Sequence, residues 1–206
     1  MTKDRLILVG AGGHSRSCID VIEAQGVYKI AGLIGFSEQV GTSQLGYEII
    51  GTDSSLVELA NKNAYALVTV GQILSSEDRV RLYQLCCKSG FRMPVVNSPF
   101  ALVSKHAEIG HGTIILHGAI VNAGARIGEN CIINTSALVE HDATINDHCH
   151  ISTGAIINGD SNIGKGTFIG SHATVLQGVS IGEDCVVGAG LCVRKDLNDR
   201  TIFRGK

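Results

Sequence analysis

The residues best suited to chemistry in this chain stand together at Glu140-His141-Asp142. An imidazole beside a carboxylate can act as a general base, because the carboxylate fixes the tautomer of the ring and raises its basicity. Glu140 is eighteen residues from both Asn122 and Asn158, so a fold that repeats every eighteen residues would stack the three side chains in a polar column. The pattern alone leaves two interpretations open, a general base at His141 and a solvated surface histidine.

A second candidate site is the glycine-rich turn Gly10-Ala11-Gly12-Gly13-His14, which follows a short apolar run. Glycines let backbone N–H groups approach an anion, and a helix that starts at such a turn adds a favourable dipole. The NAD fingerprint is incomplete, because Ser15 stands at its third glycine position and the next predicted strand ends in Gly35-Phe36 without an acid. NAD is therefore disfavoured, which leaves a sugar nucleotide, another small anion, or a tight turn without a ligand.

The elements that must position these residues are of two kinds, and the more distinctive is a six-residue repeat. From residue 103 to residue 193 every sixth residue is Val or Ile, and the residue two positions earlier is mostly Ala, Ser, Thr or Cys. This period is typical of a parallel β-helix, in which three repeats form one triangular coil of eighteen residues. The branched side chains then point into the prism, and successive coils stack about 4.8 Å apart.

The repeat places its histidines on different faces of the coil. His111, His117 and His141 each stand two residues after a repeat position, but they belong to three different faces and cannot converge on one metal ion within a chain. Three cysteines fall at the small inward positions, and we expect them to be buried apolar side chains without disulfides. These are Cys131, Cys149 and Cys185. No metal site is predicted.

Residues 1–98 show a different pattern, in which short apolar runs alternate with helical segments. We expect strands at 5–9, 28–34, 64–70 and 92–96, and helices at 15–25, 56–61 and 75–88, the last with a capping box at Ser75 and Asp78. Such alternation is typical of a small parallel, Rossmann-like α/β sheet. Pro94 and Pro99 bracket the change of pattern. We therefore expect an α/β domain over 1–98 packed against a β-helix over 99–206.

Composition and charge limit the classes of molecule that this chain is expected to bind. The net charge of −2 gives no reason to expect nucleic acid. The first apolar run, 6–9, is too short for a signal peptide or a membrane span, so we expect no membrane insertion and a cytoplasmic location. A coil of eighteen residues has little interior, and a chain with 44% hydrophobic residues should bury a lateral face against copies of itself.

Motifs in both halves of the chain resemble one family. They lie at 10–14, 46–51, 133–136, 139–142, 150–152 and 158–160. The family is that of the bacterial hexapeptide-repeat sugar acetyltransferases of the NeuD/PglD type, which contains sialic acid O-acetyltransferases and N-acetyltransferases of UDP- or dTDP-4-amino sugars. The resemblance covers nearly the whole chain. It implies a left-handed β-helix, a homotrimer, and acetyl-CoA bound in the groove between neighbouring helices.

The resemblance also implies roles for single residues. His141 corresponds to the family's base, Asp142 to the carboxylate that tunes it, and His150 to a histidine near the acetyl thioester; from the residue pattern we add Glu140 as a second carboxylate beside the base. Contacts with coenzyme A are implied at Ser171 and Ala189. Contacts with the nucleotide sugar are implied at Gly12, Gly13, His14 and Gly71. Gly35 and Phe36, which we add as substrate-binding candidates, stand where nucleotide-sugar members often have two aspartates.

The expected function is acetyl transfer from acetyl-CoA to the 4-amino group of a nucleotide-linked amino sugar for surface glycan or polysaccharide synthesis. His141 would take the proton of the attacking amine, which is worth roughly 10²–10⁴ in rate. Two alternatives stay open. One is O-acetylation of sialic acid or a related sugar, and the other is a non-catalytic β-helix scaffold with a ligand-sensing domain. The sequence names neither the sugar nor the nucleotide.

Overall fold

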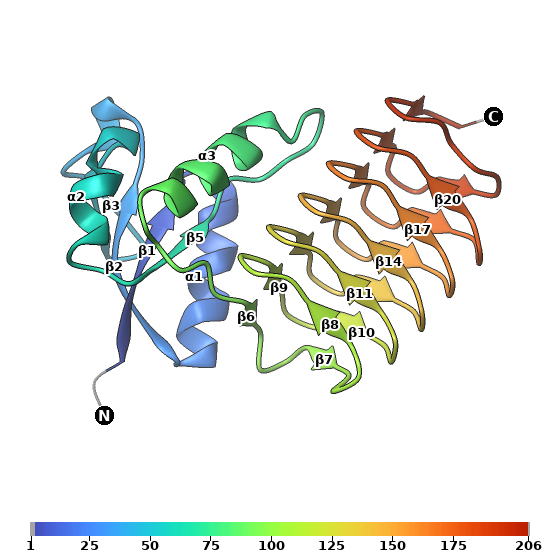
Figure 1. Ribbon diagram of the computed structural model, residues 1–206, viewed down its shortest axis with the longest axis horizontal. Helices are drawn as coiled ribbons and strands as arrows, with labels where there is room; N and C mark the ends of the chain where they lie inside the picture. Colours follow the sequence, from blue (N-terminus) through green and yellow to red (C-terminus); the bar gives the residue numbers. More distant parts are fainter. Residues whose placement is uncertain (1–2, 206) are drawn as a thin grey trace.

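The computed structural model describes residues 3–205, in which an α/β domain is followed by a column of stacked coils (Figure 1). The α/β domain contains β1 (Asp4–Val9), α1 (Gly13–Gln25), β2 (Tyr28–Ile34), β3 (Ser43–Gln44), β4 (Tyr47–Gly51), α2 (Leu56–Ala60), β5 (Tyr65–Val68) and α3 (Glu77–Lys88). Two 3₁₀ turns, η1 (Ser37–Gln39) and η2 (Asp53–Ser55), follow β2 and β4. None of the helices in residues 3–205 has the length and hydropathy of a membrane span.

The sheet of this domain has the order β3-β4-β2-β1-β5. All neighbouring strands are parallel except β3 and β4. Alternate residues of the interior strand β1 enter two different cores, since Leu6 packs with residues of α1 whereas Ile7 packs with residues of α3. The two helices therefore cover opposite faces of the sheet. This is the arrangement expected when a buried parallel strand is apolar along its whole length.

The sequence predictions for this domain were wrong in three places. The β3–β4 hairpin was not predicted, and it makes the sheet mixed. The strand predicted at 92–96 is only a single bridge between Arg92 and Tyr65, after which Val96 and Asn97 join the coils. No capping box forms at Ser75, because α3 starts at Glu77 and the Ser75 hydroxyl accepts a hydrogen bond from the Glu77 N–H at 3.1 Å.

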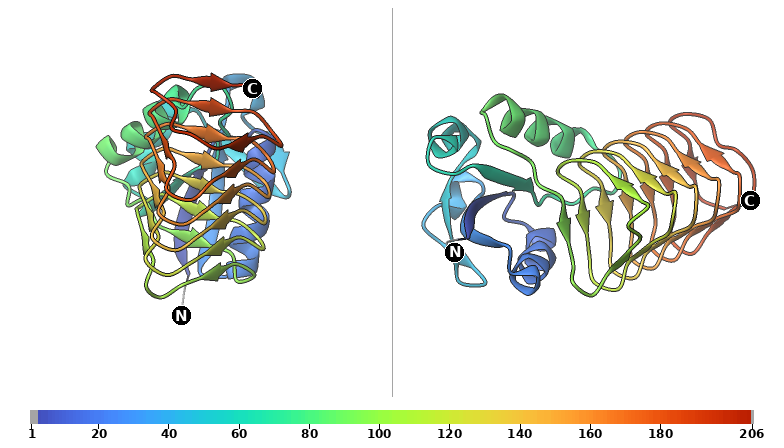
Figure 2. Two further views of the ribbon diagram at one scale, coloured as in Figure 1. Left: turned by 90° about the vertical axis from the view of Figure 1, so that its right-hand side faces the viewer. Right: turned by 60° about the horizontal axis from the view of Figure 1, so that its bottom comes forward.

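The coils form a parallel β-helix whose described strands are two residues long and lie on three faces (Figure 2). The docked face consists of β6 (Val96–Asn97), β9 (Ile114–Ile115), β12 (Ile132–Ile133), β15 (His150–Ile151), β18 (Phe168–Ile169), β21 (Val186–Val187) and β23 (Ile202–Phe203). The apolar face consists of β7 (Leu102–Val103), β10 (Ile120–Val121), β13 (Leu138–Val139), β16 (Ile156–Ile157), β19 (Thr174–Val175) and β22 (Cys192–Val193). The polar face consists of β8 (Glu108–Ile109), β11 (Arg126–Ile127), β14 (Thr144–Ile145), β17 (Asn162–Ile163) and β20 (Ser180–Ile181).

The interior of the prism follows the predicted repeat. Strand partners are eighteen residues apart, as in the pairing of Val121 with Val139 and of Val139 with Ile157. The second residue of almost every strand is buried, and the small residue before the strand fills the corner. Burial raises the pKa of the Cys149 thiol, as expected of a cysteine that serves as a small apolar side chain. The prediction of a β-helix is confirmed.

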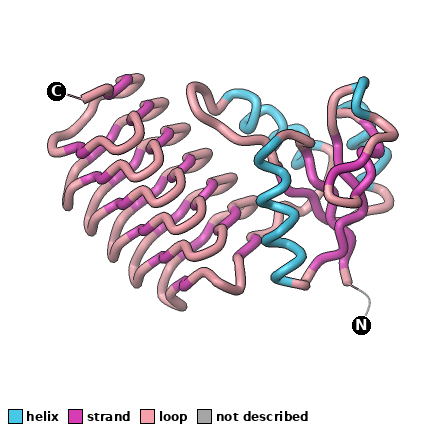
Figure 3. Tube along the Cα trace, turned by 180° about the vertical axis from the view of Figure 1, so that it is seen from behind, coloured by secondary structure: helices cyan, strands magenta, loops and turns pink. Residues whose placement is uncertain are grey.

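The α/β domain packs directly against the docked face, as predicted. Helix α1 lies beside the first coils (Figure 3), and Ile22 shares a core with Ile114 and Ile132. Arg79 of α3 is fully buried at this junction and has no carboxylate partner in residues 3–205. Its guanidinium donates to the carbonyl oxygens of Val68, Val70 and Asn130 at 2.6–3.2 Å, and burial lowers its pKa to about 10.

Candidate active site

His141 lies in the turn between β13 and β14, at the corner between the apolar and polar faces. Its ring is exposed, and Nδ1 is 2.9 Å from Oδ2 of Asp142. Hydrogen bonding to Asp142, assisted by the charges of Asp142, Glu140 and Asp160, raises the pKa of His141. The carboxylate therefore sets both the orientation and the basicity of the ring, as the residue pattern predicted for a base.

The backbone supports this pair through glycines of the neighbouring coils. Asp142 has a left-handed backbone (φ 59°), and its carboxylate occupies the space that a Cβ on Gly124 would need. Nε2 of His141 lies 2.8 Å from the position of a Cβ on Gly159. Side chains at either glycine would displace the pair, so the repeat leaves two gaps into which it fits.

Glu140 acts on the pair through its charge and through the backbone of the turn. Its Oε2 accepts hydrogen bonds from Nδ2 of Asn122 at 2.9 Å and from the backbone N–H of His141 at 3.3 Å. The carboxylate thus supports the turn and has no hydrogen bond to the imidazole. The predicted polar column is only partly present, because the Asn158 amide donates instead to the carbonyl of Val175.

His150 is buried where the docked face meets the α/β domain. Its Nδ1 is 2.8 Å from the carbonyl oxygen of Gln72, so Nδ1 carries the proton and Nε2 accepts from the amide of Asn134 at 2.9 Å. Burial lowers the pKa of His150 to about 4, so the ring is neutral. Both ring nitrogens are engaged within the chain, and the imidazole positions the loop that carries Gln72.

Ser171 and Ala189 lie one coil apart at a different corner, between the docked and apolar faces. The Ser171 hydroxyl is 3.0 Å from that of Ser152, and Ala189 is exposed. Within one chain the structure does not bring these two residues together with His141, because the corners belong to different edges of the prism. A site that uses all three residues needs a second chain.

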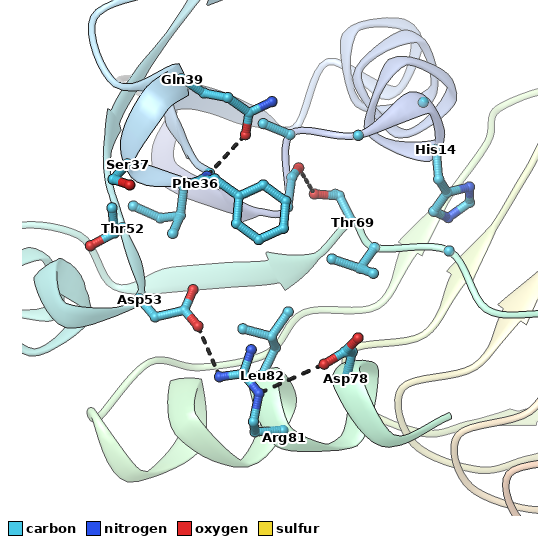
Figure 4. Close-up of a pocket in the computed structure, with 18 residues that line it drawn as sticks. His14, Phe36, Ser37, Gln39, Thr52, Asp53, Thr69, Asp78, Arg81 and Leu82 are labelled. Carbon is cyan, nitrogen blue, oxygen red and sulfur yellow. Dashed lines mark hydrogen bonds and ion pairs between the residues drawn. The ribbon is translucent and has the colours of Figure 1, made fainter. Parts of the chain in front are cut away.

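The α/β domain contains a pocket of about 560 Å³ at the carboxyl ends of its parallel strands. All six residues predicted to bind substrate line it, namely Gly12, Gly13, His14, Gly35, Phe36 and Gly71. Figure 4 shows His14 at the end of the pocket near the β-helix, and Phe36 further from the β-helix, between His14 and Asp53. The position is the crevice at which open α/β sheets bind ligands.

The glycine-rich turn forms one wall of this pocket. Gly10 has φ +122°, and a Cβ there would lie 2.9 Å from the backbone N of Val70, so only glycine fits. Gly12 is the N-cap of α1 and, like Gly13, has no neighbour within 4 Å of a hypothetical Cβ. These two positions therefore leave the start of the helix open to the pocket, as an anion site would require.

His14 connects the pocket with the domain junction. Burial, followed by the nearby Arg79 and His150, lowers its pKa to about 3, so the ring is neutral. Its Nε2 is buried and has no hydrogen-bond partner among the described residues. The rings of His14 and His150 are 6.2 Å apart. His14 thus lines the pocket at the end nearest the β-helix with a neutral ring whose Nε2 is buried and unsatisfied among the described residues.

Sequence reasoning missed several residues of these sites. Asp53, Arg81 and Asp78 line the pocket from η2 and α3, and Gln72 and Arg79 hold the junction. Because none of them lies in a repeat or a glycine motif, no local signal marks them. As to metals, residues 3–205 contain no group of three or more His, Cys, Asp or Glu side chains placed to hold an ion.

Comparisons with known proteins agree with this architecture. Residues 5–83 match the PglD N-terminal domain, and residues 162–195 match the hexapeptide repeat of succinyl-transferase. The acetyltransferase domain of PglB from Neisseria gonorrhoeae, solved with acetyl coenzyme A, is 31% identical, with a TM-score of 0.88 over 96% of this chain and 94% of its own. This chain belongs to the NeuD/PglD-type hexapeptide-repeat sugar acetyltransferases.

A second member of the NeuD/PglD-type group extends the comparison. Perosamine N-acetyltransferase from Caulobacter crescentus, solved as a histidine variant with CoA and GDP-perosamine, is 30% identical, with a TM-score of 0.89 over 94% of this chain and 90% of its own. WeeI from Acinetobacter baumannii, at 22% identity, shares the fold. Comparison with curated proteins gives no match. The predicted fold class, an α/β domain followed by a left-handed parallel β-helix, is confirmed.

Proposed function

We propose that this NeuD/PglD-type acetyltransferase moves the acetyl group of acetyl-CoA to the 4-amino group of a nucleotide-linked amino sugar used in surface glycan or polysaccharide synthesis. The observation that carries the proposal is the exposed His141–Asp142 pair in a chain that also holds an open nucleotide-sized pocket. Relatives solved with acetyl coenzyme A and with GDP-perosamine support the choice of co-substrates. No metal is assigned to the reaction.

The geometry of His141 suits direct transfer. Because Nδ1–H donates to Asp142, the lone pair is on Nε2, which accepts no hydrogen bond from residues 3–205. As the unprotonated amine attacks the thioester carbonyl, its proton moves to Nε2, and the new C–N bond replaces the C–S bond. The imidazolium can then return the proton to the departing coenzyme A thiolate. Asp142 stabilises the transient positive charge of the ring.

We divide the two substrates between the domains. The nucleotide sugar is assigned to the pocket of the α/β domain (1–98), with its phosphates at Gly12 and Gly13 and its sugar toward His14. Coenzyme A is assigned to the β-helix (99–206), near Ser171 and Ala189. The neutral His14 ring offers a buried, unsatisfied nitrogen to a sugar hydroxyl or amine. Both co-substrates are metabolites of the cytoplasm, where we place the reaction.

The site is proposed to be completed in a homotrimer. The α/β domain covers the docked face, whereas His141 lies at the corner opposite that face, so the pocket and the base of one chain are far apart. The apolar face carries Leu102, Ile120, Leu138 and Ile156 pointing outward and is not covered in the described chain. Burial of this face against copies of the chain would bring the base of one subunit to the pocket of its neighbour.

The experiment is an acetyl-transfer assay with mass detection against GDP-, UDP- and dTDP-linked 4-amino sugars, free sialic acid and its nucleotide form. The proposal expects acetylation of one nucleotide-linked amino sugar and its loss in His141→Ala. His106→Ala is the matched control, because His106 is an exposed histidine on the same corner, two coils earlier. Acetylation of sialic acid alone, or coenzyme A binding without transfer to any acceptor, would overturn it.

A further inference from the structure

The wall of the pocket that faces Phe36 carries an ion pair that none of the assignments above uses. Oδ2 of Asp53 in η2 lies 2.8 Å from Nη1 of Arg81 in α3, and Asp78 approaches Nε of Arg81 at 3.9 Å. All three line the pocket (Figure 4). The pair is partly exposed, so it adds little to stability. Its place in the pocket makes it available to a ligand.

The first two pocket residues after β2, Gly35 and Phe36, have no polar side chain to offer a nucleoside. A Cβ at Gly35 would lie 2.7 Å from Oε1 of Gln39 and 3.1 Å from Cγ2 of Ile49, so a larger side chain there would have to displace Gln39 from its present position. The next residue, Phe36, is 73% exposed, and its backbone N–H is held by Gln39 Oε1 at 2.9 Å. The strand end therefore offers an aromatic face on a fixed backbone, which suits stacking against a base.

Resting on the proposed function, we propose that the part of the pocket away from the β-helix selects a guanine nucleotide. The base stacks on Phe36, and its edge forms hydrogen bonds with Asp53 and Arg81. Guanine presents a carbonyl oxygen beside two N–H donors. The oxygen accepts from the Arg81 guanidinium, and the two N–H groups donate to the Asp53 carboxylate. Arginine contacts with guanine O6 are a common means of base recognition.

The other bases fit this pair less well. Adenine and cytosine place an amino group where guanine has its carbonyl, so a donor would face the guanidinium. Uracil and thymine present one N–H between two carbonyls, so one carbonyl oxygen would face the carboxylate. Among the residues lining the pocket, the carboxylates are Asp53 and Asp78, and Asp78 is the more exposed. The Asp53 carboxylate is therefore the acceptor that determines which base the pocket prefers.

The test is calorimetric titration of the full-length protein with GDP, IDP, UDP, dTDP, CDP and ADP. GDP should bind at least about tenfold more tightly than the others. IDP lacks the guanine amino group and should be intermediate. Asp53→Asn should weaken GDP by about 10- to 100-fold and make GDP and IDP equal. Phe36→Leu should weaken all six ligands by a similar factor, since stacking is nearly independent of the base.

Glu58→Gln is the matched control, because Glu58 forms an exposed ion pair with Lys62 on α2 outside the pocket. Thermal melting checks that each variant folds, and Arg81→Gln repeats the test from the other side of the pair. Tighter binding of UDP or dTDP than of GDP, no binding of any nucleotide, or retained GDP preference in Asp53→Asn would overturn the inference. Acetyl transfer to a UDP- or dTDP-linked amino sugar would do so while leaving the proposed function intact.

Discussion

The imidazole of His141 lies directly over Gly159, the residue one coil further along the same corner. Nε2 and Cε1 of the ring are each 2.8 Å from the place a Cβ on Gly159 would take. Gly159 does not have a positive φ, so its backbone conformation does not require glycine. Glycine is needed here for the space beside the ring. The position of the catalytic candidate is therefore determined partly by a residue that makes no hydrogen bond to it.

This contact predicts the effect of Gly159→Ala. The methyl group should push the ring off its position and lower kcat by about 10- to 100-fold, as small displacements of catalytic groups do, with a small effect on the melting temperature. Gln177→Ala is the control, because Gln177 is the exposed residue one coil beyond Gly159 on the same corner. Steady-state kinetics with a verified acceptor measures both. Full activity in Gly159→Ala would show that the ring works from another position.

The His141–Asp142 pair predicts a particular pH profile. His141→Ala should lower kcat by about 10²–10⁴ and leave acetyl-CoA binding nearly unchanged. A base must be unprotonated, so kcat/KM should fall as the pH drops below the pKa of His141, which Asp142 holds above its usual value. Asp142→Asn removes that effect, so its maximal rate should be lower and its acidic limb should move to lower pH. If the acidic limb of Asp142→Asn lies at the same pH as that of the parent, the group that titrates is not His141.

The β-helix could be predicted from the sequence because its stability depends on a local rule repeated many times. Each branched residue at a sixth position fills the same interior, so the pattern survives any single exception such as Leu191 at a small position. The candidate base was predictable for a similar reason, since Asp142 is adjacent to His141 in the chain. The glycine-rich turn was also visible, because Gly10 is required by a close approach to Val70.

What could not be predicted depends on long-range placement. Arg79 bonds to Asn130 across 51 positions, and His150 bonds to the Gln72 carbonyl across 78. Neither pair has a motif, because a backbone carbonyl can come from any residue type. The sequence likewise could not show that Glu140 supports the turn. Whether the Glu140 carboxylate bonds to Asn122 or to the imidazole depends on side-chain geometry in two neighbouring coils.

The buried histidines predict sensitivity to acid. Burial lowers the pKa of His150 to about 4, from about 6.5 in the unfolded chain, so the unfolded state binds more protons between these values. The free energy of unfolding should therefore fall as the pH drops from 6.5 to 4, by on the order of 3 kcal/mol from this residue. His14, with a pKa of about 3, acts in the same direction.

Urea unfolding of His150→Gln at pH 7 and pH 4.5 measures this effect. The variant should be less stable at pH 7, because it loses the fit between the Gln72 carbonyl and the Asn134 amide, but its loss of stability toward pH 4.5 should be smaller than that of the parent. His172→Gln, which changes an exposed histidine, should keep the parent's pH dependence. Equal pH dependence in His150→Gln and the parent would contradict the assignment of a buried neutral ring.

The apolar face predicts that a charge placed on it prevents assembly of the proposed trimer. Ile120 is 38% exposed in the single chain and lies between Leu102 and Leu138 on this face. A buried carboxylate without a partner is costly, so Ile120→Glu should convert a trimer into monomers in analytical ultracentrifugation. Thr144→Glu makes a similar change on the polar face and should leave the trimer intact. A trimer that persists in Ile120→Glu would place the subunit contacts elsewhere.

If the base and the pocket of one site come from different subunits, two inactive variants should restore each other. His141→Ala keeps its pocket, and His14→Ala keeps its base, so a mixed trimer contains interfaces where an intact pocket meets an intact base. Random mixing in equal amounts gives about one such site in four, and co-expression should therefore return roughly a quarter of the parent activity. Each variant expressed alone should stay inactive. Mixed trimers without activity would mean that each chain supplies both parts of its own site, which the opposite placement of His141 and the docked face argues against.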